Sequence, residues 1–189
     1  DGGAMFGVVP KVLWQKTNPA DKNNLIDLSM RCMLIEDGDR LILIDTGMGN
    51  KQSEKFFGYY YLFGDFTLDS SLAKLGFHRD GITDVFLTHL HFDHCGGSIQ
   101  LNSTKTGFES AFKNAKFWSN ENHWNWALDP NSREKASFLT ENIQPIEESG
   151  QLNFVKLSQN SRLQNTALGF DVYLADGHTE KQMIPMLNY

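Results

Sequence analysis

Residues 88–97, Thr-His-Leu-His-Phe-Asp-His-Cys-Gly-Gly, hold three of the chain's six histidines and one aspartate within six positions. The segment directly follows an apolar run that predicts a buried strand. In an extended backbone, positions i and i+2 point to the same side, so His89 and His91 can bind one cation together. If the chain then turns, Asp93 and His94 face a second cation nearby. This spacing is hard to explain by incidental loop histidines.

The residue types indicate the metal. Neutral imidazoles and a carboxylate suit zinc, and they also accept iron, manganese or cobalt. Gly96 and Gly97 follow the motif, and we expect them to let the backbone turn tightly beneath the site.

The surrounding segments predict a mixed α/β sandwich rather than a doubly wound parallel sheet. Strand-like patterns, the first three forming an antiparallel meander with a hairpin turn at Asp37-Gly38, occur at 5–16, 25–36, 41–45, 83–88, 115–119, 152–157, 169–175 and 182–187. Helical patterns occur at 70–75, where Ser70 is the expected cap, and at 120–128 and 131–143.

Size and charge narrow the class of protein. One domain over 1–189 is the default expectation for 189 residues. A formal net charge of -6 disfavours a nucleic-acid partner. No apolar run reaches membrane-spanning length, so we expect no membrane partner. We expect a cytoplasmic location, with a periplasmic or secreted one left open.

An aromatic block lies between the first strands and the motif. Residues 56–66 hold seven aromatics in eleven positions. They fit a core helix or lid that packs on the domain. They equally fit one wall of an apolar substrate pocket, with Phe56, Phe57, Tyr60 and Phe63 as candidate lining residues. The two interpretations are compatible.

The motif resembles the H-x-H-x-D-H signature of the metallo-β-lactamase superfamily. Leu43-Ile44-Asp45-Thr46-Gly47 is similar to its strand-end Asp-Thr-Gly, and Asp176-Gly177-His178-Thr179 is similar to its Gly-His-Thr. The order and approximate separations of the three segments also agree. The resemblance covers residues 5–189 and implies an αββα sandwich with metals between the edges of the two sheets.

The resemblance also implies roles for individual residues. It implies a first metal on His89, His91 and His178, a second on Asp93 and His94, and a hydrogen bond accepted by Asp45 that orients a ligand. A complete site would hold two zinc ions, with iron, manganese or cobalt as alternatives. Asp93 would also take or guide a proton.

Within the superfamily, the motif and its flanks look most like the N-acyl-homoserine lactonase-type branch. That resemblance implies a metal-activated water that attacks an ester or lactone carbonyl of an apolar small molecule. Organophosphate hydrolysis, thioester hydrolysis of the glyoxalase II type and a non-catalytic metal-binding scaffold are the alternatives. Dimers are common in the lactonase-type branch, so a homodimer is a further expectation.

The sequence departs from the family pattern after His178. The superfamily has a metal-bridging Asp and a last His beyond its Gly-His-Thr segment, and neither occurs in the eleven residues that follow His178. We therefore expect a domain that is incomplete at its C-terminus, with weak occupancy of the second metal position. Glu180-Lys181 also replaces the usual Pro-Gly, so the local turn is expected to differ.

Overall fold

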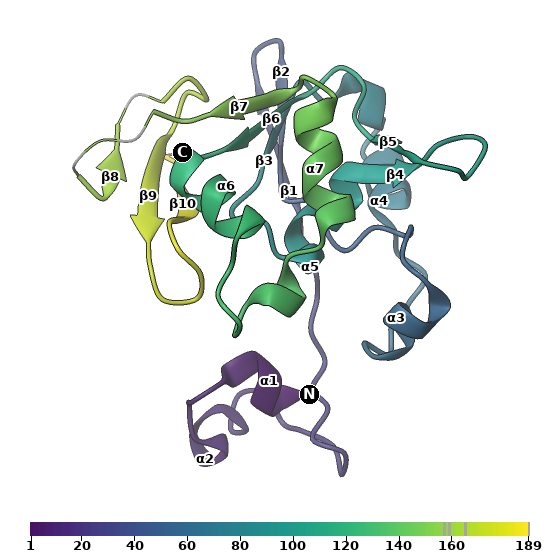
Figure 1. Cartoon of the computed structure of the whole chain (residues 1–189), viewed down its shortest axis with the longest axis vertical. Helices are drawn as coiled ribbons and strands as arrows, with labels where there is room; N and C mark the ends of the chain where they lie inside the picture. The colour runs from purple at the N-terminus through teal and green to yellow at the C-terminus, as the bar shows by residue number, and fades with distance from the viewer. Residues whose placement is uncertain (157, 159, 165, 189) are drawn as a thin grey trace. The chain divides into compact units, whose positions relative to one another are not determined.

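The computed structural model describes residues 1–156, 158, 160–164 and 166–188, which form two compact units, Asp1–Met30 and Arg31–Tyr189 (Figure 1). The first unit contains α1 (Gly2–Phe6) and α2 (Lys11–Trp14). The strand predicted over 5–16 is therefore wrong. The Asp1 carboxylate accepts N–H bonds at the start of α1, and the Phe6 ring stacks on the buried Trp14 ring, with centroids 5.0 Å apart. These contacts favour two short helices over a strand.

The second unit is built around a five-stranded sheet in the order β1-β2-β3-β6-β7. Its strands are β1 (Met33–Asp37), β2 (Arg40–Ile44), β3 (Asp84–Phe86), β6 (Lys116–Ser119) and β7 (Leu152–Phe154). Only β1 and β2 pair antiparallel, through the predicted hairpin, and every later pair in this sheet is parallel. The antiparallel meander predicted for the first third therefore does not form.

Alternate residues of the central strands serve two separate cores. Leu43, Val85 and Phe117 belong to one buried cluster, and their neighbours Ile44 and Phe86 belong to another. This follows from the two-residue period of a strand, which sends successive side chains to opposite faces. Both faces of the central sheet are therefore covered.

Helices cover the first face and a second sheet covers the other. The helices are α3 (Glu54–Gly58), α4 (Leu68–Lys74), α5 (Phe92–Cys95), α6 (Glu121–Leu128) and α7 (Thr140–Glu148), with short turns η1 (Arg79–Gly81), η2 (Gly96–Ser98) and η3 (Lys135–Ser137). Buried residues of α4 to α7 pack in the first cluster. The second sheet contains β8 (Arg162–Leu163), β9 (Asp171–Ala175) and β10 (Gln182–Met186), and a small hairpin contains β4 (Ile99–Leu101) and β5 (Phe108–Ser110). The predicted α/β fold class is confirmed, with one helix layer and two sheets of the αββα arrangement in place.

Two helix predictions need correction. The helix predicted from Ser70 begins at Leu68, because Thr67 and Ser70 form a reciprocal capping box. The helix predicted over 131–143 is replaced by η3 and α7. The Asn131 side chain accepts the N–H groups of Arg133 and Glu134, which fixes a turn there. No helix that the structure describes is long and apolar enough to cross a bilayer.

Candidate metal centre

Strand topology brings the motif segments to one edge of the central sheet. Because β2 and β3 are parallel neighbours, Asp45 and the segment after Phe86 leave the sheet side by side. His178 arrives from the second sheet, on the turn between β9 and β10. A backbone bond from Met183 N–H to the Thr88 carbonyl, at 2.8 Å, joins that sheet to the start of the motif.

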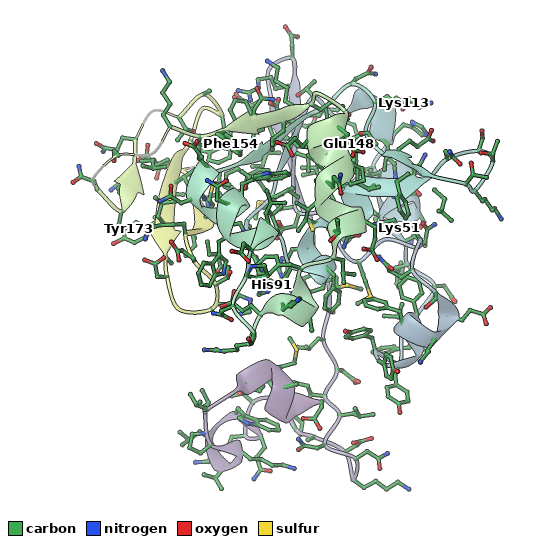
Figure 2. The ribbon with its side chains drawn as sticks, in the orientation of Figure 1. Lys51, His91, Lys113, Glu148, Phe154 and Tyr173 are labelled. Carbon is green, nitrogen blue, oxygen red and sulfur yellow. The ribbon has the colours of Figure 1, made fainter. Side chains whose placement is uncertain are left out.

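Three imidazoles converge at this edge. Ligand atoms of His89, His91 and His178 all lie within 4.8 Å of one another. The Nε2 atoms of His89 and His178 are 3.2 Å apart, and the rings of His91 and His178 have centroids 4.8 Å apart. Figure 2 shows His91 at the end of the second unit, where α5 and the loop between α6 and α7 lie. The grouping matches the first metal position predicted from the sequence, and the role of each residue as a ligand stays a prediction.

Burial keeps two of these imidazoles, those of His89 and His91, in the neutral form that a cation needs. His89 and His91 are 1% and 6% exposed. Burial, reinforced by the neighbouring imidazoles, lowers the pKa of His89 well below its ordinary value, and burial lowers the pKa of His91 to about 4. Nε2 of His91 is buried and has no hydrogen-bond partner among the described residues. Neutral, clustered imidazoles with an unsatisfied nitrogen fit a divalent metal of the zinc type.

A chain of hydrogen bonds orients His89. The Thr88 hydroxyl lies 2.8 and 3.1 Å from the two carboxylate oxygens of Asp45, which only accept, so the hydroxyl donates to Asp45. Thr88 Oγ1 is then free to accept from His89 Nδ1–H, at 3.0 Å. This arrangement leaves the lone pair on His89 Nε2, the atom that faces His178. Asp45 has a φ of 58°, a left-handed conformation that Asp tolerates better than most residues.

Asp45 also holds His94. Its Oδ2 lies 2.8 Å from His94 Nδ1, while His94 Nε2 faces Asp93 Oδ2 at 3.7 Å. Burial lowers the pKa of His94, but the hydrogen bond and charge of Asp45 outweigh burial, and the pKa is raised overall. Asp93 and His94 therefore lie together, with the Asp45 carboxylate against His94. The metal-binding roles of Asp93 and His94 and the orienting role of Asp45 stay predictions. Among the described residues, neither Asp93 nor His94 belongs to a group of three or more side chains close enough to hold one metal ion.

The predicted pocket residues divide into two groups. Phe56 and Tyr60 contact Phe92 of the motif, with ring centroids 5.3 and 5.0 Å apart. Phe57 contacts Phe56 at 5.8 Å, and Phe63 is 75% exposed. Only Phe56 and Tyr60 therefore touch the motif, and the assignment of all four to a substrate pocket stays a prediction.

Two buried polar residues outside the motif also reach the centre. His123, on α6, is 1% exposed and contacts the backbone of both ligand segments. The Glu134 carboxylate accepts from Thr179 at 2.7 Å and lies 3.8 Å from His91 Nε2. Hydrogen bonds from Thr179 and Trp126 keep the pKa of Glu134 below its ordinary value against the effect of burial. Sequence reasoning missed Glu134, because nothing in its local sequence marks it.

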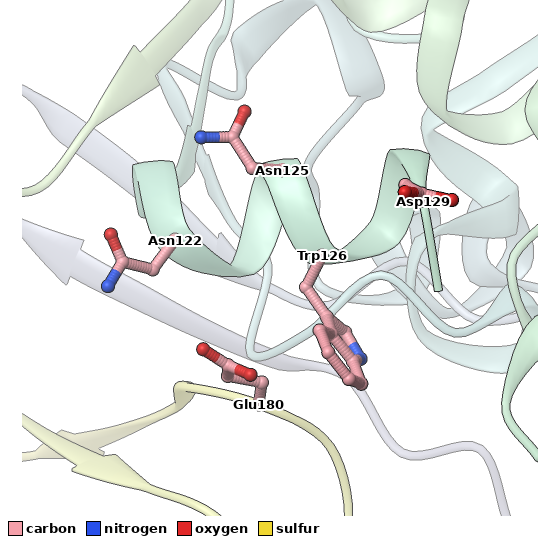
Figure 3. A pocket seen from close by; sticks show the side chains of 5 residues that line it. All are labelled: Asn122, Asn125, Trp126, Asp129 and Glu180. Carbon is pink, nitrogen blue, oxygen red and sulfur yellow. The ribbon is translucent and has the colours of Figure 1, made fainter. Parts of the chain in front are cut away.

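A shallow recess beside the centre is lined by different residues. Its lining residues are Asn122, Asn125, Trp126 and Asp129 of the α6 region and Glu180, which lies beside the helix (Figure 3). None of the three clustered imidazoles lines this recess, so it is separate from the candidate metal centre.

Comparisons with known proteins agree with the layered fold and with the imidazole cluster at the sheet edge. Residues 28–106 match the family model of the metallo-beta-lactamase superfamily. An N-acyl homoserine lactonase of Bacillus thuringiensis is 27% identical over 108 residues, which cover 49% of this chain and 43% of the lactonase. The chain thus spans less than half the length of this curated relative.

Solved structures give the same result. The structure of a probable metal-dependent hydrolase from Staphylococcus aureus is 30% identical, with a TM-score of 0.82, and the match covers 98% of this chain and 63% of that one. The dizinc quorum-quenching lactonase AidC has a TM-score of 0.61 at 24% identity, over 84% of this chain and 52% of that one, which shows a shared fold. Residues 28–106 thus resemble the metallo-β-lactamase superfamily, and the chain is similar to the lactonase-type branch of that superfamily.

Proposed function

We propose that the protein is a metal-dependent hydrolase that acts on an ester or lactone carbonyl of an apolar small molecule. The observation that carries the proposal is the convergence of the ligand atoms of His89, His91 and His178 within 4.8 Å. The names of the curated relatives, which are N-acyl homoserine lactonases, support the substrate class.

In this proposal, His89, His91 and His178 hold the first cation, and Asp93 with His94 holds a second. A divalent cation held by these residues would supply an activated water and would polarise a carbonyl oxygen. Asp45 fixes the orientation of His94 through Nδ1 and, by way of Thr88, that of His89.

The remaining motif residues supply the proton path and the apolar surface. The Asp93 side chain is 29% exposed, so its carboxylate can accept a proton on the open side of the centre. The rings of Phe56, Tyr60 and Phe92 lie together next to it. We propose that this aromatic group contacts the acyl chain of the substrate, because apolar burial would contribute affinity without taking part in the chemistry.

The test combines metal content with activity. Mass spectrometry should find at least one equivalent of a zinc-type metal, and the sample should hydrolyse N-hexanoyl homoserine lactone. His89→Ala and His178→Ala should each lose metal and lower kcat/KM at least about 100-fold, the upper end of the loss seen when an outer-sphere partner is removed. His78→Ala is the control, because the His78 side chain is 79% exposed and lies outside the cluster.

A phosphotriester and a thioester are assayed beside the lactone. Preferential hydrolysis of the phosphotriester or the thioester would change the proposed substrate class, but the protein would still be a metallo-hydrolase. A folded sample with neither metal nor hydrolysis of any of the three substrates would overturn the proposal.

A further inference from the structure

His123 forms two hydrogen bonds that join the two ligand segments. Its Nε2 accepts the Leu90 N–H at 2.9 Å, and Leu90 lies between His89 and His91. Its Nδ1 lies 2.6 Å from the Glu180 carbonyl, two residues beyond His178. Because a carbonyl only accepts and a backbone N–H only donates, one neutral tautomer satisfies both bonds, with the proton on Nδ1.

Both ring nitrogens of His123 are therefore engaged with the backbone. A fourth imidazole next to three clustered ones would suggest another ligand, but His123 has no nitrogen left for a cation. Its ring centroid is 6.4 Å from that of His89, and it is not a member of the imidazole cluster. Its contribution must come through the backbone that it holds.

Other contacts show that α6 is built against the turn that carries His178. The Asn120 side chain caps α6 by accepting the His123 N–H and donates to the Lys181 carbonyl at 2.9 Å. Glu134, beyond the end of α6, accepts from Thr179 at 2.7 Å. The turn around His178 is thus held on both sides, and His123 is the side chain that extends this hold to the segment of His89 and His91.

We propose that His123 is a positioning residue that assembles the metal-binding triad before any cation binds. The inference rests on the proposed metal site. Without His123, the Leu90 N–H loses its partner inside a buried region, and the turn carrying His178 loses the bond that joins Glu180 to the motif by way of the imidazole. The Met183–Thr88 backbone bond remains at the start of the motif. The third proposed ligand, His178, lies 84 residues beyond His94 in the sequence. Without His123, the conformational entropy lost when His178 is brought to the site would therefore weaken metal binding.

Three substitutions separate the two bonds. His123→Asn places an amide donor near the position of Nδ1 and keeps only the bond to Glu180. His123→Gln places an amide oxygen near the position of Nε2 and keeps only the bond from Leu90. His123→Leu keeps neither. The same substitutions at His78 are matched controls, because that side chain is 79% exposed.

Two measurements test these variants: the affinity for Co²⁺, and hydrogen exchange in the metal-free protein. Titration with Co²⁺, followed by absorption, should show affinity lowered about 10- to 100-fold in His123→Leu, less in the Asn and Gln variants, and unchanged in the His78 series. In the metal-free protein, hydrogen exchange at the Leu90 amide should stay slow in His123→Gln and become faster in His123→Asn.

Each outcome decides the proposal. Wild-type Co²⁺ affinity in His123→Leu, or equal Leu90 protection in the Asn and Gln variants, would overturn it. If His123→Leu does not fold, the Asn and Gln pair carries the same comparison. If the wild-type protein binds no Co²⁺, the proposed function fails, whereas weakened binding in the variants alone tests His123.

Discussion

At the scale of single residues, the Thr88 hydroxyl links the Asp45 carboxylate to the His89 imidazole of the candidate metal centre. It donates to Asp45 and accepts from His89, and this sets which nitrogen of His89 keeps its lone pair. Thr88→Val preserves the shape of the side chain but removes both bonds, so the wrong tautomer becomes accessible. Co²⁺ affinity should fall about 10-fold or more, the lower end of outer-sphere effects, when measured by titration.

Thr88→Ser is the matched control for this prediction, because it keeps the hydroxyl and loses only a methyl group. It should bind Co²⁺ within a few-fold of the wild-type protein. In the metal-free protein, the ¹⁵N shifts of the His89 ring should keep the Nδ1–H pattern in Thr88→Ser and become mixed in Thr88→Val. Identical ring shifts in the two variants would show that Thr88 does not select the tautomer.

The residues of the motif could be predicted because their chemistry is local in the sequence. His89, His91, Asp93 and His94 occupy six positions after a strand, and the structure places them together. Glu134 and the bracing contacts of His123 could not be predicted. The bonds that join them to the segments of His91 and His178 span between 33 and 57 residues, and only tertiary packing identifies them.

At the scale of elements, the loop after β2 and the turn after α5 lie in direct backbone contact. Thr46 N–H donates to the His94 carbonyl at 2.8 Å, and Gly97 N–H donates to the Gly47 carbonyl at 2.9 Å. The buried Lys51 donates to the Gly96 carbonyl, and burial lowers the pKa of its ammonium to about 8. These bonds hold the motif against the end of the neighbouring strand.

The two motif glycines are explained by this contact. Gly96 has a φ of -59°, which any residue can adopt, so left-handed backbone is not the reason for glycine there. A Cβ at Gly96 would lie 2.3 Å from the Met48 carbonyl oxygen, and one at Gly97 would lie 2.2 Å from that of Thr46. The sequence correctly indicated tight backbone geometry, but the physical cause is close approach rather than a special turn conformation.

Gly97→Ala should therefore separate the two loops. Overpacking against backbone atoms should lower the free energy of unfolding by about 2 kcal/mol or more, measured by urea denaturation of the metal-free protein. Co²⁺ affinity should fall with it, because His94 lies in the displaced turn. Gly58→Ala is the control, because a Cβ there meets no atom within 4 Å, and its stability should change by no more than about 0.5 kcal/mol. An equal effect of both substitutions would contradict the close-approach explanation.

Element types and boundaries followed the local pattern where one face of an element is buried. The strands at β2, β3, β6, β9 and β10 were predicted within one or two residues by their apolar runs. The error over residues 5–16 arose because Val, Phe and Trp favour strands, whereas packing around Trp14 favours helices. The short strands β4 (Ile-Gln-Leu) and β5 (Phe-Glu-Ser) were missed, because neither lies in an apolar run like the one that contains the equally short β3.

At the scale of the whole molecule, the metal centre lies where two sheets meet, and several buried imidazoles are concentrated there. Burial lowers the pKa of His89, and it lowers the pKa values of His91 and His123 to about 4 from an ordinary 6.5. Between pH 6.5 and pH 4, these imidazoles are therefore protonated in the unfolded chain but remain neutral in the folded metal-free protein. Stability from these groups is complete above pH 6.5 and is lost as the pH falls toward 4.

The free energy of unfolding of the metal-free protein should accordingly fall between pH 7 and pH 4, by on the order of 3 kcal/mol for each such histidine at most. The raised pKa of His94 opposes the trend, since that group favours folding as it gains its proton. Urea denaturation at pH 7, 6, 5 and 4.5 measures the slope, and His123→Gln should make it shallower while His78→Gln should not. A slope that is flat, or unchanged in His123→Gln, would mean that the buried imidazoles are hydrated in solution, and the lowered pKa values of His89 and His91 would then be wrong.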